Sequence, residues 1–78
     1  MSAQQYIFDA ISNERERQDA KWGADRHLNS REWLPILVEE IGEVAKAILE
    51  GKEIELRSEL VHVAAVVVAW LECIFDNN

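Results

Sequence analysis

A chain of 78 residues with a hydrophobic fraction of 49% and a formal net charge of −7 forms a single domain, residues 1–78. The negative charge argues against nucleic-acid binding, which depends on basic residues that neutralise phosphates. The single Cys73 excludes an internal disulfide, no signal peptide is recognisable, and the apolar run 63–71 is shorter than a membrane span. We therefore expect a cytoplasmic protein that binds neither nucleic acid nor membrane.

The N-terminal third predicts a first helix. Ser2 can cap it, and its apolar side chains recur at spacings of three and four residues before the helix ends near Gly23. Residues 23–30 then form a polar loop. The apolar positions that carry this periodicity are Tyr6, Ile7, Ala10, Ile11 and Trp22.

A second helix is predicted to begin at Ser30 and to stop at Gly51. Ser30 can cap it, Glu32 suits the first turn, and Pro35 comes early enough that its missing N–H costs little. On a helical wheel the apolar residues occupy one sector about 140° wide, which we expect to face the core. They are Leu34, Leu37, Val38, Ile41, Val44, Ala45, Ile48 and Leu49.

A third helix is expected over residues 54–75, after a short turn. Between residues 63 and 71 it is apolar on all sides, which predicts burial in several directions. The fold class is therefore all-α, a three-helix unit in which the second and third helices form an antiparallel hairpin. Because two partner helices cannot cover the third helix, we expect a homo-oligomer, at least a dimer, that assembles into an oligomeric helical bundle.

Acidic residues gather on the second helix at Glu39, Glu40 and Glu43, where like charges repel by roughly 0.2–0.5 kcal/mol per pair. Glu59 and His62 lie at the edge of the apolar part of the third helix. At a rise of about 1.5 Å per residue the two groups lie level in an antiparallel hairpin. Such carboxylates either raise their pKa values or bind a divalent cation such as Mg²⁺ or Mn²⁺.

Each of these groups has a simpler explanation. The carboxylates of the second helix could form a solvated face that pairs with Lys46 and Arg57. His62 could be a partly buried imidazole hydrogen-bonded to Glu59 or Glu40. The acidic helices could also belong to a small helical interaction module that binds a basic partner, and such a module would lack saturable divalent metal binding.

The segments "EEIGE" (39–43) and "ELVH" (59–62), with "RERQDAKWG" (15–23) upstream, resemble the MazG-like all-α nucleoside triphosphate pyrophosphohydrolases. The resemblance implies hydrolysis of a nucleoside triphosphate to the monophosphate and pyrophosphate, in a house-cleaning or nucleotide-pool role, with Mg²⁺ as cofactor and Mn²⁺ as an alternative. It implies Glu39, Glu40, Glu43 and Glu59 as catalytic residues, and Glu40, Glu43, Glu59 and His62 as metal ligands. It also favours a tetramer, built as a dimer of dimers, over a simple dimer.

His62 stands where the family pattern has Asp, and imidazole suits Mn²⁺ or Zn²⁺ better than Mg²⁺. Three interpretations follow: catalysis tolerates His, the metal preference is altered, or the chain binds nucleotide without hydrolysing it. Glu55, one turn before Glu59, is a possible replacement ligand.

Substrate binding would also need cations and a surface for the base. Arg17, Lys21 and Lys46 are candidates for the phosphates, and Trp33 is a candidate for stacking on the base. Ordinary surface ion pairs are the simpler explanation for the three cations. Core packing is the alternative for Trp33 and the expected role of Trp22.

Overall fold

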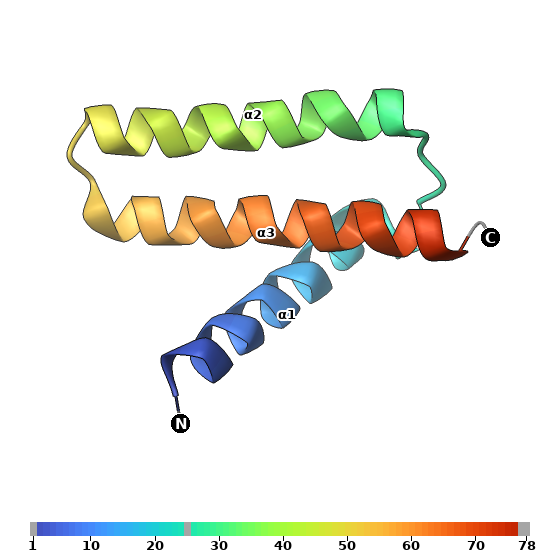
Figure 1. Ribbon diagram of the computed structural model, residues 1–78, viewed down its shortest axis with the longest axis horizontal. Coiled ribbons are helices and arrows are strands. Elements are labelled where there is room, and N and C mark those ends of the chain that lie inside the picture. Colours follow the sequence, from blue (N-terminus) through green and yellow to red (C-terminus); the bar gives the residue numbers. More distant parts are fainter. Residues whose placement is uncertain (1, 25, 77–78) are drawn as a thin grey trace.

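The computed structural model describes residues 2–24 and 26–76 and contains three helices, α1 (Ala3–Trp22), α2 (Ser30–Leu49) and α3 (Glu53–Asp76). These described residues include no strand, which confirms the all-α class. In Figure 1, α2 and α3 lie side by side and are joined by a short turn, while α1 crosses α3 at an angle. Helix α3 contacts both of the others and is the centre of the fold.

The ends of α1 are as predicted. The side chain of Ser2 accepts a hydrogen bond from the backbone N–H of Gln5, and this satisfies a donor that the helix leaves unpaired. Gly23 ends the helix with a φ of 94°, a conformation that a residue without Cβ adopts readily. Gly51, with a φ of 69°, also has a positive φ and directly follows Glu50, the C-cap of α2.

The cap of α2 is one residue earlier than predicted. The side chain of Asn29 accepts a hydrogen bond from the backbone N–H of Glu32 at 3.1 Å, and the Glu32 carboxylate accepts one from the Asn29 N–H at 3.4 Å. This reciprocal capping box makes Ser30 the first helical residue instead of the cap. The Ser30 hydroxyl accepts a hydrogen bond from Trp70 Nε1 at 3.1 Å.

The core lies between α2 and α3, at the end nearest the loop that follows α1. Trp33 from α2 is its largest member, with 1% of its surface exposed, and it packs against apolar residues of α3. The other buried members of this cluster are Val66, Ala69 and Cys73, surrounded by Leu28, Ile36, Leu37 and Trp70.

The predicted core face of α2 is wrong for most of its residues. Of that sector only Leu37 and Val44 are half-buried, because α3 covers the neighbouring face of α2, the face that carries Trp33 and Ala47. The remaining residues of the predicted face are exposed: Leu34, Val38, Ile41, Ala45, Ile48 and Leu49.

Helix α3 is buried on fewer sides than predicted. Ala65, Val66, Ala69 and Cys73 are buried, but several apolar side chains between and after them stay partly exposed. By length and composition alone, α3 is also apolar enough to cross a membrane. The core helix of a soluble protein passes the same test, so this property does not determine where the chain resides.

Candidate metal centre

Glu40 of α2 meets Glu59 and His62 of α3 near the middle of the two helices. One ligand atom from each of these residues lies within 4.8 Å of the others. His62 Nδ1 faces both carboxylates, 3.4 Å from Glu59 Oε2 and 3.8 Å from Glu40 Oε2. All three side chains are half-buried, so the group is reachable from solvent yet partly desolvated. We call these three residues the acidic trio.

A fourth residue, Glu14 of α1, approaches the other side of His62. Its Oε1 lies 3.7 Å from His62 Nε2, and only 9% of the Glu14 side chain is exposed. A carboxylate that faces the second ring nitrogen is the usual way in which proteins orient a metal-binding histidine. With its proton on Nε2, His62 would turn toward Glu14 and leave the Nδ1 lone pair pointing at Glu40 and Glu59.

Glu14 is itself held firmly. Arg17 donates two hydrogen bonds to its oxygens, from Nε at 2.8 Å and from the terminal guanidinium nitrogen at 2.6 Å, and Gln18 Nε2 donates a third at 3.2 Å. The hydrogen bond from Arg17 is the main reason that the pKa of Glu14 lies below its ordinary value. Glu14 therefore stays ionised beside His62.

The electrostatics of Glu40 are of the opposite kind. Burial raises the pKa of Glu40 above its ordinary value, the nearby His62 lowers it, and the charges of Glu59, Glu43 and Glu14 raise it further. A carboxylate with this balance favours a neighbouring positive charge. A divalent cation or a protonated His62 could supply that charge.

Three other predicted acidic residues lie outside the acidic trio. Glu43 influences the pKa of Glu40 but is exposed and does not belong to the group of close ligand atoms. Glu39 is also exposed. Glu55, suggested as a replacement ligand, is exposed and faces Lys52 at 3.9 Å, so the structure does not bring it to the site.

The predicted substrate-binding cations differ in their surroundings. Arg17 reaches the site but is engaged by Glu14. Lys21 lies 4.6 Å from the centroid of the Trp22 ring. Because Trp22 is 49% exposed, the prediction that Trp22 packs in the core is wrong. Lys46 lies in the last turn of α2, exposed and without an ion pair to any described residue.

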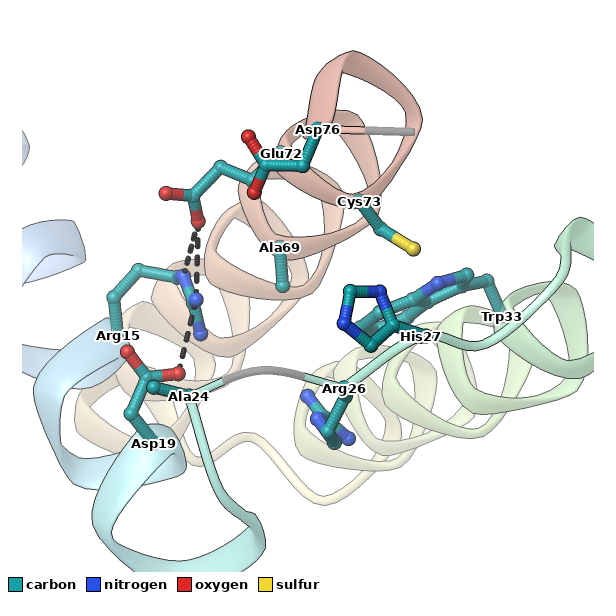
Figure 2. A pocket seen from close by; sticks show the side chains of 10 residues that line it. All are labelled: Arg15, Asp19, Ala24, Arg26, His27, Trp33, Ala69, Glu72, Cys73 and Asp76. Carbon is teal, nitrogen blue, oxygen red and sulfur yellow. Dashed lines mark hydrogen bonds and ion pairs between the residues drawn. The ribbon is translucent and has the colours of Figure 1, made fainter. Parts of the chain in front are cut away.

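Trp33 does not fit its predicted role in stacking on a base, because it is buried in the core and covered by Arg26, whose guanidinium lies 4.8 Å from the ring centroid. Its indole N–H is buried and has no acceptor among the described residues. Figure 2 shows Trp33 behind His27 in a pocket of about 270 Å³ near the C-terminal end of α3.

The charges of that pocket are partly satisfied by the chain itself. Arg15 donates a hydrogen bond to Glu72 at 3.1 Å and forms an ion pair with Asp19 at 3.0 Å (Figure 2). The Cys73 thiol donates to the backbone oxygen of Leu28 at 3.2 Å. These contacts fix the end of α1 and the following loop against α3, which is a structural role.

A wider hollow of about 500 Å³ opens beside His62, between α1 and α3. Arg17 and Arg57 are its cations, and Arg57 is only loosely paired, with Glu53 at 4.0 Å. Tyr6, Asn13 and Ser58 add polar groups. Of the acidic trio only His62 lines this hollow, so an anionic molecule bound there would lie beside His62 and Glu14.

The sequence interpretation missed Glu14 as part of the site. Its signal was present, because Ile7, Ile11, Glu14 and Gln18 recur at spacings of four and three residues. Glu14 and Gln18 thus continue the apolar stripe of α1 toward α3, and both are buried. A carboxylate on such a stripe needs a specific partner.

No family model matches this chain, and no curated protein or solved structure matches it.

Proposed function

We propose that this chain binds a divalent cation through Glu40, Glu59 and His62 and hydrolyses nucleoside triphosphates to monophosphates and pyrophosphate. The observation that carries the proposal is the close approach of these three side chains, with one ligand atom each within 4.8 Å. The nucleotide comes from the resemblance of residues 39–43 and 59–62 to MazG-like pyrophosphohydrolases. In this proposal α2 and α3 act as an antiparallel hairpin within a cytoplasmic, oligomeric helical bundle.

The donor set fits a divalent cation of intermediate hardness. Two carboxylates and one imidazole suit Mn²⁺ better than Mg²⁺, which prefers oxygen ligands throughout. When bound, such a cation would polarise the phosphoryl oxygens and lower the pKa of a bound water. Mg²⁺ thus remains the cofactor that the resemblance implies, and Mn²⁺ is the one that His62 favours.

The other residues of the site would position its ligands and the substrate. Glu14 would orient His62, while Arg57 and Arg17 would offset phosphate charge in the hollow between α1 and α3. Glu39 and Glu43 would join only after their exposed side chains turned toward the acidic trio. Lys46 and Lys21 do not line this hollow.

A second candidate is a nucleotide-binding or helical interaction module without catalysis. It is favoured by the position of His62, with a carboxylate near each ring nitrogen. A protonated imidazole would neutralise part of the acidic charge, and no metal would then be needed.

The deciding experiment measures pyrophosphate release from a panel of nucleoside triphosphates with Mg²⁺ and with Mn²⁺. We expect greater activity with Mn²⁺ and its loss in Glu59→Gln. Glu55→Gln is the matched control, because Glu55 lies one turn away on the same helix and faces Lys52 instead. Calorimetry should show Mn²⁺ binding to the wild type and to Glu55→Gln, and loss of this binding in Glu59→Gln.

Two results would contradict the proposal. Metal binding that is equally strong in wild type and Glu59→Gln would remove the acidic trio as the site. Saturable Mn²⁺ binding without pyrophosphate release from any nucleotide would exclude the enzyme and favour the non-catalytic candidate.

A further inference from the structure

A second apolar stripe runs along the exposed surface of α2. Its residues are separated by four, three, four and three positions, which is the heptad spacing of a coiled-coil seam. Four of them have exposed fractions between 50% and 60%. We call this stripe the α2 seam; it consists of Leu34, Val38, Ile41, Ala45 and Ile48.

Gly42 lies beside Ile41, at the edge of the α2 seam and in the interior of the helix. Apart from Pro, glycine is the least favourable residue at such a position. A Cβ at Gly42 would meet no atom within 4 Å, so the packing of this chain does not require a glycine there. A glycine at position 42 would allow another helix to approach closely, because glycine has no side chain.

The total exposed area of the chain, summed over all three helices, is large enough to include one interface of standard size. The protein exposes 5769 Å², whereas scaling predicts about 4,900 Å² for a folded monomer of 9.0 kDa. The excess of roughly 900 Å² is similar to the area, about 800 Å², that each partner buries in a standard protein interface.

We propose that the α2 seam binds the same seam of a second copy of this chain, with the two α2 helices antiparallel about a twofold axis at Ile41. This register places Leu34 opposite Ile48 of the second copy and brings Val38 to within one residue of the level of Ala45 of the second copy. A parallel pair would instead set Ala45 against Ala45 and leave a gap. The contact is self-complementary, as a closed dimer requires.

The charges of α2 are compatible with this arrangement. The positions that flank the α2 seam are uncharged, since they include Leu37, Gly42, Val44 and Leu49. The neighbouring carboxylates Glu39 and Glu43 lie on the far side of the helical wheel. Two copies therefore approach along α2 without placing acidic side chains against each other.

The proposal is independent of the metal chemistry, because the α2 seam contains no member of the acidic trio. It also relocates the interface that the sequence suggested. The expectation of a homo-oligomer rested on α3, whereas the more exposed and more regular apolar surface is on α2.

Sedimentation of the full chain tests the interface. Wild type should sediment at twice the mass of the 9.0 kDa chain, and Ile41→Glu should sediment as a monomer with unchanged helix content, because Ile41 is 50% exposed. Phe8→Glu is the matched control, with 52% exposure on α1. A monomeric wild type would overturn the proposal, as would an Ile41→Glu variant that remains dimeric. A monomeric protein that binds phospholipid vesicles would also overturn the proposal, and would assign the apolar surface to a membrane.

Disulfide crosslinking tests the register, in a Cys73→Ser background that removes the native thiol. At an antiparallel twofold axis only Ile41 faces its own copy, so Ile41→Cys should crosslink rapidly on mild oxidation. Leu34→Cys and Ile48→Cys should each crosslink poorly alone and efficiently when combined in one chain. Rapid crosslinking of Leu34→Cys alone would overturn the antiparallel arrangement.

Discussion

The two faces of α2 follow the same residue spacing and have different surroundings. The inner face carries Trp33 and Ala47, which α3 buries to 1% and 5% exposure. The outer face is the α2 seam, where Ile41 and Ile48 remain 50% and 60% exposed. Both faces repeat at spacings of four and three residues, the inner one through Trp33, Leu37, Glu40, Val44 and Ala47. Periodicity therefore identifies surfaces that need a partner, but it does not tell which partner covers them.

The largest effect is expected from the inner face. Trp33→Ala should destabilise the chain by about 3–5 kcal/mol, because it removes the largest side chain of a small core. A domain of this size has little stability to lose. Thermal unfolding followed by circular dichroism measures the difference.

Trp33→Phe sharpens this prediction. Because the indole N–H has no acceptor among the described residues, Phe removes a buried, unsatisfied donor along with some packing area. Its cost should be far below that of Ala. An equal loss in the two variants would mean that the N–H has a partner or that the pocket does not close around Phe.

Gly42 on the outer face should respond in a different way. Gly42→Ala should stabilise the isolated chain by about 1 kcal/mol, since alanine favours the helix and its Cβ has open space. The same substitution should weaken dimerisation, because the added Cβ would meet the second copy. Unfolding at low protein concentration and sedimentation at high concentration separate the two effects. Stabilisation with unchanged association would place Gly42 outside the interface.

The sequence predicted the helices of this protein better than their packing. Caps and breakers such as Ser2, Gly23 and Gly51 act locally, so the ends of the helices followed directly, and the exception at Asn29 is a shift of one residue. Which apolar face meets α3 depends on side-chain fit between distant segments. A helical wheel places Leu37 and Leu34 in the same apolar sector, so it cannot tell which part of that sector contacts α3.

The candidate site was predictable to a similar extent. Glu40, Glu59 and His62 were found because their heights along two connected helices follow from the residue count. The contribution of Glu14 depends on how α1 crosses α3, which no local pattern specifies. Trp33 was open to base stacking or core packing because its position on the wheel fits both a binding surface and a core, and the structure places it in the core.

The smallest expected effect concerns Glu40, at the edge of the inner face. Burial raises its pKa in the folded state above the ordinary value of 4.5. The folded chain therefore binds this proton more tightly than the unfolded chain does, so the contribution of Glu40 to stability falls as the pH rises through and above 4.5.

Glu40→Gln should consequently raise the stability of the metal-free protein at pH 7 by an amount below about 1 kcal/mol, with no gain below pH 4. Glu39→Gln is the control, because Glu39 is exposed on the same helix and should change little. Adding Mn²⁺ should reverse the order: the wild type gains stability from a ligand bound only by the folded state, and Glu40→Gln gains much less. Melting temperatures at two pH values, with and without Mn²⁺, measure both effects. A Glu40→Gln variant that Mn²⁺ stabilises as strongly as the wild type would separate the raised pKa of Glu40 from metal binding and remove Glu40 from the proposed site.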